Sequence, residues 1–337
     1  MATKVAIVGV TGYAGGELAR LLLRHPGVRV VAAVARSHQG EPLRTALPHL
    51  HDAPDALRIG TDVGDAEVVF TALPAGEAAK LAPKWLEDGR RIIDIGSDFR
   101  LKDPLLYAKW YGYAHPAPEL LAESVYGLTE LARASLPGAR VVANPGCYPT
   151  AALLALAPAV GLITADVIVD AKSGVSGAGH VVEDAYLYGT IDESVRTYGV
   201  PKHRHTPEIA QGLAAIGLTP KLTFTPHLIP MTRGLLATCY APLRDGVTAA
   251  QVSEAYATRY ANEPFVRVTS SFPPTKATLG SNWCLVHAVV DEDNRRLVAV
   301  GVLDNLVKGA AGQAVQNFNL LCGQPETAGL EAMPLWP

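Results

Sequence analysis

Cys147 is the residue whose position best suits a nucleophile. It follows a short apolar run, 141–143, and the turn-forming residues Asn144-Pro145-Gly146, and it precedes a predicted helix over 151–160. Pro149 fits the first turn of that helix. Because a helix N-terminus favours a thiolate, we expect the pKa of this thiol to lie below its reference value of about 8.5. The alternative is a small buried side chain without chemistry.

The segment His203-Arg204-His205-Thr206-Pro207-Glu208 carries the second chemical signal. Two histidines separated by one residue on a strand could place two zinc ligands on one face. No third ligand follows at a suitable spacing, so we expect no metal site. A cysteine and a histidine without metal form the commoner arrangement for covalent catalysis, in which the imidazole transfers the proton. The similar pair His49 and His51 lies in a polar stretch and predicts surface residues.

A glycine-rich turn near the N-terminus predicts a nucleotide site. The apolar run 5–8 has the pattern of a strand buried in a parallel sheet, and a helix is predicted over 17–25. Between them, Gly9 permits a tight turn and Gly12 lets a pyrophosphate approach the backbone at a helix N-terminus. The cofactor contacts expected in this turn are Gly9, Thr11, Gly12, Tyr13 and Ala14. The spacing GxxGxxG departs from the GxGxxG fingerprint, so a plain strand–helix turn is the alternative.

The residues after the second predicted strand, 28–34, indicate the type of cofactor. A free ribose 2′-hydroxyl usually meets an acidic residue at this point. The sequence has Ala35-Arg36-Ser37-His38 here and no acid before Glu41. Since a guanidinium and a hydroxyl suit a 2′-phosphate, Arg36 and Ser37 predict NADP(H) as the cofactor. An exposed arginine on a loop is the alternative.

A nucleotide site, a thiol and a histidine together predict hydride transfer through a thioester. A thioester carbonyl is less stabilised by resonance than an ester carbonyl, so it accepts hydride readily. The thiolate is also a good leaving group when the resulting thiohemiacetal collapses. The histidine protonates the hemiacetal oxygen in one direction and removes that proton in the other.

The elements that must position these residues fall into two groups. The first half alternates strands (66–73, 91–95 and 141–143) with helices such as 75–87, which predicts a Rossmann-type, doubly wound parallel sheet. After Cys147, longer apolar runs predict an α+β domain with a mixed sheet. Its strands are expected at 167–171, 221–229, 235–241, 283–290 and 297–303, with helices at 248–260 and 306–321. We therefore expect an NADP-binding domain of residues 1–146 and 305–337, and a catalytic and oligomerisation domain of residues 147–304.

Composition limits the classes of protein that fit. The chain has 337 residues, of which 49% are hydrophobic and 18% charged, and this is ample for two folded domains. Its net charge of −3 favours neither nucleic acid nor an anionic membrane as a partner. No export signal and no apolar run near the ~20 residues of a membrane helix is recognised, so we expect a cytoplasmic protein. Four widely spaced cysteines predict free thiols; they are Cys147, Cys239, Cys284 and Cys322.

Six motifs, in order along the chain, closely resemble those of the N-acetyl-γ-glutamyl-phosphate reductase family. They are the glycine turn from Gly9 to Gly16, Asp94-Ile95-Gly96-Ser97-Asp98-Phe99-Arg100, Asn144-Pro145-Gly146-Cys147-Tyr148-Pro149-Thr150, Ser173-Gly174-Val175-Ser176-Gly177-Ala178-Gly179, the His203 to Glu208 segment, and the run from Asp304 to Gly312. The resemblance implies NADPH-dependent reduction of a small acyl phosphate to a semialdehyde in the acetylated arginine pathway, with release of phosphate. It also implies a relation to aspartate-semialdehyde dehydrogenases and a homodimer or homotetramer.

The same resemblance implies a role for each matching residue. Cys147 is the nucleophile that expels phosphate, and His203 is the acid/base, with His205 so close in the motif that sequence does not separate the two. Arg100 holds the phosphate or the substrate carboxylate, although an ion pair with Asp98 is the alternative. The remaining contacts are Ser176 and Gly177 along the nicotinamide, Asn305 at its carboxamide, and Asn144, His205 and Glu208 toward the substrate.

Two other functions stay open at this point. A relative in an α-aminoadipate route to lysine performs the same chemistry on a substrate attached to a carrier protein. That relative resembles Gly-Cys-Asn around its cysteine, whereas this chain has Gly146-Cys147-Tyr148, so acetylglutamyl phosphate is preferred. The rival of a different class is a non-catalytic NADP-binding regulator. Cys147 and His203 count against it, because a binding module does not need a thiol at a helix start.

Overall fold

The apolar runs of the first half form a parallel sheet in the computed structural model, which describes residues 2–180 and 183–336. In spatial order its strands are β3 (Ile59–Gly60), β2 (Val28–Val34), β1 (Thr3–Val8), β4 (Val68–Thr71), β5 (Arg91–Asp94), β7 (Val141–Ala143) and β6 (Val125–Tyr126). Neighbouring strands pair in parallel, for example Val5 with Val68 between β1 and β4. Because β2 and β4 flank β1 on opposite sides, the winding reverses between β1 and β4. The doubly wound sheet predicted from the sequence is confirmed.

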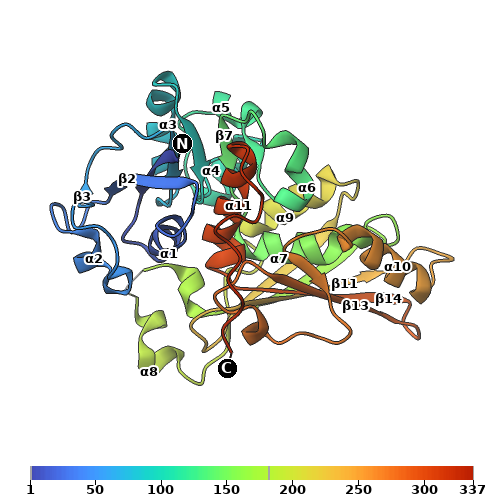
Figure 1. The fold of residues 1–337 in the computed structure, drawn as a ribbon. Helices are drawn as coiled ribbons and strands as arrows, with labels where there is room; N and C mark the ends of the chain where they lie inside the picture. The colour runs from blue at the N-terminus through green and yellow to red at the C-terminus, as the bar shows by residue number, and fades with distance from the viewer. Residues whose placement is uncertain (1, 181–182, 337) are drawn as a thin grey trace. The chain divides into compact units, whose positions relative to one another are not determined.

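Helices connect and cover these strands. They are α1 (Tyr13–Leu22), α2 (Leu43–Ala46), α3 (Glu77–Glu87), α4 (Leu105–Tyr111), α5 (Glu119–Glu123), α6 (Thr129–Ala132) and α11 (Gly312–Leu321). Helix α11 comes from near the end of the chain, coloured red in Figure 1. Its Phe318 is fully buried, and the centroid of its ring lies 5.6 Å from that of Phe70 on β4. The core of this unit is therefore completed by residues distant in sequence.

The chain divides into two compact units, one of Met1–Pro145 with Ala310–Ala332 and one of Gly146–Gly309 with Met333–Pro337. Compared with the expected domain limits, Gly146 and residues 305–309 and 333–337 lie with the second unit instead of the first. Hydrogen bonds explain the placement of residues 305–309, because the Asn305 amide bonds Gly234 and Ser176 of the second unit.

The second unit contains a mixed sheet of longer strands. In spatial order they are β12 (Val266–Val268), β13 (Cys284–Asp291), β14 (Arg296–Leu303), β11 (Leu235–Pro242), β8 (Asp166–Ser173), β10 (Lys221–Leu228) and β9 (Arg196–Thr197). Helices α7 (Cys147–Leu156) and α10 (Ala249–Tyr260) pack on one side of this sheet, with α9 (His205–Ala215) against β10 (Figure 1). The approach of α7 is close, since a Cβ on Gly301 of β14 would lie 2.4 Å from the Ala151 carbonyl oxygen. The predicted α+β unit with a mixed sheet is confirmed.

The opposite side of this sheet carries a mixture of small, polar and apolar side chains, which are only partly buried. Ile168 on β8 and Val289 on β13 are 36% and 37% exposed, and Tyr240 on β11 is half-buried. A strand whose other face packs on helices normally places polar residues on its free face. The apolar residues on this face therefore indicate a surface that another chain can cover.

Three local expectations differ from the structure. Helix α7 begins at Cys147, not at Ala151. Pro149 is its third residue, and a proline fits there because the N–H groups of the first helical turn have no partner within the helix, so the N–H that proline lacks is not missed. The His203–His205 segment is not a strand: α9 starts at His205, since Pro207 suits a first helical turn and not the middle of a sheet. The predicted final helix begins with a π-helical turn, Val307–Ala311, before α11.

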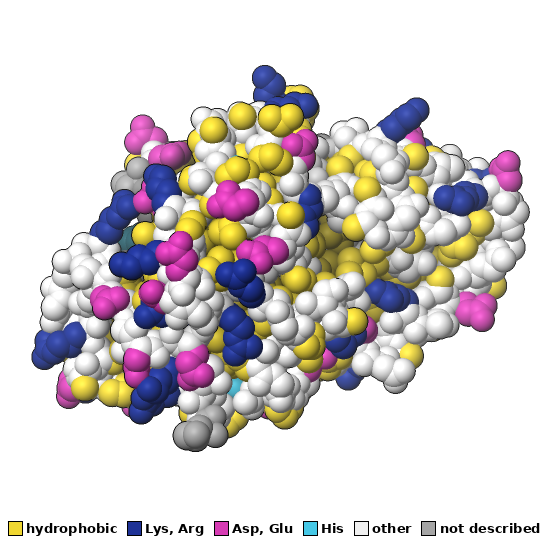
Figure 2. Space-filling model, turned by 90° about the horizontal axis from the view of Figure 1, so that it is seen from above, with side chains coloured by type: hydrophobic (Ala, Val, Ile, Leu, Met, Phe, Trp, Pro, Cys, Tyr) yellow, Lys and Arg dark blue, Asp and Glu magenta, His cyan; other side chains and the backbone are white. Residues whose placement is uncertain are grey.

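The remaining short elements are helix α8 (Tyr188–Ile191) and the 3₁₀ turns Pro48–Leu50, Arg133–Ser135, Ala157–Ala159, Val175–Ala178, Asp184–Tyr186 and Thr275–Thr278. Across the ranges that the structure describes, no helix has the length and apolar character needed to cross a membrane. On the face shown in Figure 2, basic and acidic side chains are interspersed instead of being gathered by sign.

Candidate active site

The nucleophile expected from the sequence lies at the junction of β7 and α7. Gly146 is extended (φ −69°, ψ 157°), and Cys147 is the first residue of the helix and half-buried. The Gly146 N–H donates to Oε1 of the fully buried Glu208 at 2.8 Å. The Thr150 hydroxyl donates to the Gly146 carbonyl at 2.9 Å. These two contacts fix the backbone from which the thiol projects, and the positive end of the helix favours its thiolate.

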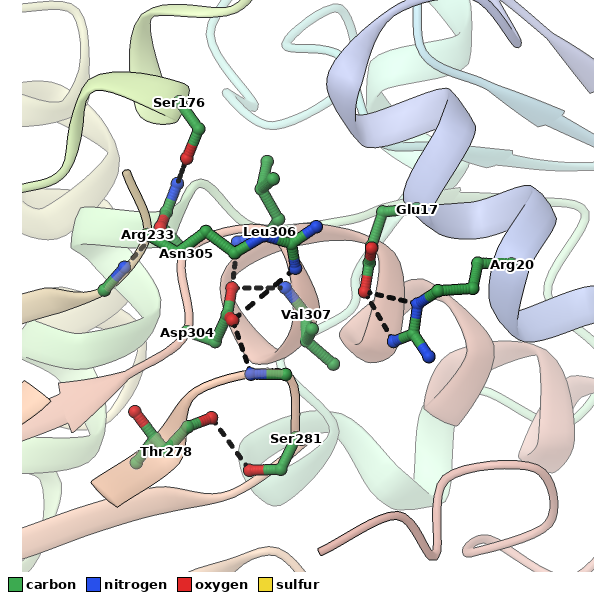
Figure 3. A network of polar contacts seen from close by, with 12 residues as sticks. Glu17, Arg20, Ser176, Arg233, Thr278, Ser281, Asp304, Asn305, Leu306 and Val307 are labelled. Atoms are coloured by element: carbon green, nitrogen blue, oxygen red, sulfur yellow. Dashed lines mark hydrogen bonds and ion pairs between the residues drawn. The ribbon is translucent and has the colours of Figure 1, made fainter. Parts of the chain in front are cut away.

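The π-helical turn packs directly against this cysteine. A Cβ on Gly309 would lie 2.8 Å from the Cys147 Cβ, so only glycine allows this approach. Asp304, fully buried, holds the start of the turn: Oδ1 accepts the N–H groups of Leu306 and Val307, and Oδ2 accepts that of Gly280 (Figure 3). π-Turns of this kind occur frequently at functional sites.

Asn305 connects two loops of the same unit. Its Oδ1 accepts the Gly234 N–H at 2.8 Å, and its Nδ2 donates to the Ser176 hydroxyl at 2.9 Å (Figure 3). A Cβ on Gly177 would meet the Ser173 hydroxyl at 2.7 Å. The structure thus brings together Ser176, Gly177 and Asn305, the three residues that the family resemblance assigns to the nicotinamide.

The two histidines lie at the start of α9, with ring centroids 4.9 Å apart. Nδ1 of His203 accepts the backbone N–H of His205 at 3.1 Å. The His203 ring is also packed edge-on against Tyr148, Tyr198 and Phe224. Burial, together with the charge of Arg204, lowers the pKa of His203 to about 4. His203 is therefore a neutral imidazole at neutral pH, with its proton on Nε2.

Two tyrosines complete the surroundings of the thiol and were not assigned roles from the sequence. The Tyr148 hydroxyl donates to the His227 carbonyl at 3.1 Å, and the Tyr198 hydroxyl lies 3.2 Å from that of Tyr148. Burial raises the pKa of Tyr198 to about 12, so it stays protonated. The position of Tyr148 directly after Cys147 was a signal that could have identified it. Tyr198 is brought in only by the pairing of β9 with β10.

In the first unit, the glycine turn fits a dinucleotide. Gly9 has φ +91°, and a Cβ there would lie 2.3 Å from the Ala72 carbonyl oxygen after β4. A Cβ on Gly15 would lie 2.2 Å from the Gly9 carbonyl oxygen. Gly12 precedes α1 without a side-chain cap, so the first N–H groups of that helix, from Tyr13 and Ala14 onward, face the turn as anion donors.

The loop after β2 lies beside this turn. The hydroxyls of Thr11 and Ser37 are 3.2 Å apart. Arg36 is 89% exposed and forms an ion pair with Glu77, the first residue of α3, at 2.6 Å. Thr11, Arg36 and Ser37 are thus brought together, and Glu77 is an additional charged residue that the sequence did not point to.

Arg100 and Asn144 are both buried in the first unit. The Arg100 guanidinium donates to the carbonyls of Asn144 and Ile95, at 2.9 Å and 2.8 Å. Asn144 donates to the Ala310 carbonyl and accepts from Asn317. These contacts link the ends of β5 and β7 to the C-terminal segment, and the substrate roles of the two residues stay predictions.

Asp98 is engaged by backbone groups. Its carboxylate accepts the N–H groups of Gly76 and Ala79 at the start of α3 and the hydroxyl of Tyr113. Burial and the neighbouring Asp98 charge raise the pKa of Asp94 well above its usual range. Within residues 2–180 and 183–336, no cluster of three or more histidine, cysteine or acidic side chains could hold a metal ion.

Two family models match the chain, the NAD binding domain of semialdehyde dehydrogenases over residues 4–139 and their dimerisation domain over residues 147–305. Among solved structures, aspartate semialdehyde dehydrogenase II of Vibrio cholerae, complexed with ASA, has a TM-score of 0.74 at 19% identity and covers 96% of this chain and 99% of its own. The enzyme of Candida albicans with NADP has a TM-score of 0.67 at 15% identity, covering 95% and 98%. These structures show a shared fold.

Sequence relatives are much closer. An N-acetyl-gamma-glutamyl-phosphate reductase of Dehalococcoides mccartyi is 51% identical over 340 residues, which cover 99% of both chains. Reductases of the same name from Symbiobacterium thermophilum and Acidithiobacillus ferrooxidans are each 48% identical, over 100% and 99% of both chains. Identity of this extent over the whole chain shows that the protein is an enzyme, an oxidoreductase, and that it belongs to the N-acetyl-gamma-glutamyl-phosphate reductase family.

Proposed function

We propose that this enzyme reduces N-acetyl-γ-glutamyl phosphate to N-acetylglutamate 5-semialdehyde and phosphate, with NADPH, in arginine biosynthesis. The observation that carries the proposal is the half-buried thiol of Cys147 at the start of α7, in a unit that also holds the two histidines. The names of relatives about half identical to this chain support the choice of substrate.

Cys147 begins the reaction as a thiolate. It attacks the acyl carbonyl, the bond between the carbonyl carbon and the phosphate oxygen breaks, and inorganic phosphate leaves with the electron pair. The product is a thioester on Cys147. After reduction of this carbonyl, the thiohemiacetal loses its hydroxyl proton and expels the thiolate, which releases the aldehyde and restores Cys147.

The two histidines divide the proton chemistry. Nδ1 of His203 accepts the backbone N–H of His205. A proton on Nδ1 would therefore point at this N–H, and the hydrogen bond would be lost because both groups would be donors. His203 is therefore a hydrogen-bond donor through Nε2–H, which stabilises charge on the carbonyl oxygen. We assign the transferable proton to His205, the reverse of the order expected from the sequence. Glu208 positions the Gly146 backbone and thereby the thiol.

The glycine turn and the loop after β2 are the parts of this chain that would hold NADP(H). Gly9 permits the tight turn, Gly12 lets the pyrophosphate approach the backbone, the α1 amides donate to it, and Arg36 and Ser37 bind the 2′-phosphate. When bound, the cofactor supplies the hydride. Ser176, Gly177 and Asn305 form the loop surface assigned to the nicotinamide side.

We propose a homodimer through the free face of the second sheet, as the matched dimerisation domain suggests. Ile168, Tyr240 and Val289 supply the apolar surface on this face. Light scattering after gel filtration tests this assignment. Ile168→Lys is expected to lower the molar mass to that of one chain, whereas Leu105→Lys, at an exposed position on α4, is not. A monomeric unaltered protein would reject the dimer.

The function is tested by phosphate-dependent reduction of NADP with N-acetylglutamate semialdehyde. The same assay with carrier-linked aminoadipate semialdehyde separates the lysine-route alternative. Activity with the acetylglutamyl substrate, and at least tenfold less with the other, is expected. Activity with neither, or a preference for the carrier-linked substrate, contradicts the proposed reaction.

A further inference from the structure

Arg36 forms an ion pair with an acidic residue of the same chain. Its Nη2 lies 2.6 Å from Oε2 of Glu77, the first residue of α3. The other carboxylate oxygen of Glu77 accepts Lys80 Nζ at 2.8 Å. Hydrogen bonds and charge from Lys80 and Arg36 lower the pKa of Glu77, so its carboxylate is ionised at neutral pH. Arg36 is thus occupied by an anion of the chain itself.

This ion pair lies beside the glycine turn. Ser37, the next residue, contacts the Thr11 hydroxyl within that turn. Asp98 fixes the position of Glu77 by accepting the Gly76 and Ala79 N–H groups on either side of it. The start of α3 is therefore anchored, and Glu77 is presented to Arg36 from a rigid element of the same unit.

We propose that Glu77 is a specificity-determining residue, which competes with the 2′-phosphate of NADP(H) for the guanidinium of Arg36. The inference rests on the NADP(H) site proposed above. Carboxylates and phosphates use the same forked donors of arginine, so a phosphate that approaches Nη2 of Arg36 competes with the Glu77 carboxylate bound there. NAD(H) has only a hydroxyl at this position and gains nothing when Glu77 is displaced. Glu77 therefore reduces the preference for the phosphorylated cofactor below what Arg36 and Ser37 alone would give.

The expected effect is small because the pair is exposed. Arg36 and Glu77 have side chains 89% and 27% exposed, and exposed ion pairs contribute weakly. Glu77→Gln keeps the size of the side chain and removes its charge. We expect about two- to fivefold tighter binding of a 2′-phosphate ligand to this variant. The gain should shrink as salt is added.

The test measures binding by titration calorimetry with two fragments, 2′,5′-ADP and 5′-AMP, so that it does not depend on turnover. Glu77→Gln is expected to bind 2′,5′-ADP more tightly and 5′-AMP unchanged. Glu87→Gln is the matched control: Glu87 is exposed at the other end of α3, about 15 Å away at the helical rise. It removes the same charge and should change neither affinity.

The Arg36→Gln variant tests whether Glu77 acts through Arg36. When Arg36→Gln is already present, Glu77→Gln should not increase the affinity for 2′,5′-ADP, because Glu77 and the 2′-phosphate no longer compete for a guanidinium. An unchanged or weaker affinity of Glu77→Gln for 2′,5′-ADP overturns the inference, as does an equal gain with Glu87→Gln or in the Arg36→Gln background. If the unaltered protein binds 2′,5′-ADP no better than 5′-AMP, the NADP(H) assignment itself fails, and the two failures are distinguishable.

Discussion

Two strand–turn–helix junctions of this protein, β1 to α1 and β7 to α7, begin their helices with nearly the same backbone. Gly12 (φ −77°, ψ 163°) and Gly146 (φ −69°, ψ 157°) are both extended residues that precede the helix. Glycine brings no side-chain oxygen to either helix start. The two junctions differ in what surrounds the exposed amides, and the roles proposed for them differ accordingly.

At the first junction the chain keeps the helix start open. Gly9 and Gly15 let the backbone pack closely at the turn, and a Cβ on Gly12 would have a single neighbouring atom of the chain, the Gly9 carbonyl oxygen at 3.6 Å. At the second junction the chain fills the space with its own groups. The Glu208 carboxylate accepts the Gly146 N–H, and Gly309 packs on Cys147. The thiol of Cys147 therefore lies at the positive end of the helix dipole. In the proposed function, one local backbone structure binds the cofactor at the first junction and presents the nucleophile at the second.

Replacement of the thiol separates the two junctions most strongly. Cys147→Ser should reduce kcat by several orders of magnitude, because a serine hydroxyl is scarcely ionised at neutral pH and an ester accepts hydride poorly. Binding of 2′,5′-ADP to the first junction should be unchanged. If the variant keeps more than about a tenth of the kcat, a loss below 1.4 kcal/mol, Cys147 is not the nucleophile.

The histidines sharpen the description of the second junction. His205→Asn is expected to lower kcat for semialdehyde oxidation about 10²–10⁴-fold, because the group that takes the proton is lost. His203→Asn should lower kcat without changing its pH dependence between pH 5 and 8, because the pKa of His203 is about 4 and its ring is already neutral in this range. If instead His203→Asn changes that pH dependence and His205→Asn raises only KM, the two roles are those expected from the sequence.

Two glycines of the first junction have different roles: Gly9 allows the backbone turn itself, and Gly12 leaves space beside the backbone for a ligand. Gly9→Ala should lower the free energy of unfolding by roughly 2–5 kcal/mol, because the residue has φ +91° and its Cβ would overlap the Ala72 carbonyl. Gly12→Ala should fold normally, since its φ is −77° and the nearest atom to its Cβ is 3.6 Å away. Its Cβ should still weaken 2′,5′-ADP binding about tenfold. Urea unfolding and calorimetry distinguish the two, and equal effects on stability would contradict this distinction.

The smallest expected effect is the pH dependence of stability due to His203. The folded pKa of about 4 lies below the reference value of 6.5, so the unfolded chain binds more protons between these values. The stability that neutral His203 contributes is complete above about pH 6.5 and is lost as the pH falls toward 4. This loss is about 2–3 kcal/mol. Urea unfolding of the unaltered enzyme and of His203→Asn should differ by that amount between pH 7 and pH 4.5; parallel curves would contradict the assignment.

Much of the architecture follows from the sequence because buried parallel strands are continuous apolar runs. The runs 28–34 and 141–143 are strands with those limits in the structure. The Cys147, Gly9 and Asn305 neighbourhoods were likewise recognisable from motifs. Irregular backbone could not be recognised from the sequence, because the π-turn over Val307–Ala311 has the same apolar pattern as a regular helix. Partners distant in sequence, such as Tyr198 with Tyr148 or Glu77 with Arg36, depend on strand pairing and helix position that no local pattern contains.

The placement of α11 has a consequence for the order of folding during synthesis. Phe318 and Asn317 complete the core and the polar contacts of the first unit, yet they follow residues Gly146–Gly309 of the second unit in the chain. The ribosome therefore releases Met1–Pro145 long before the residues that finish its packing. Until then Phe70, fully buried in the completed fold, lacks the aromatic ring that packs against it. We expect the nascent first unit to be only partly stable, and the second unit, continuous over Gly146–Gly309, to fold ahead of it.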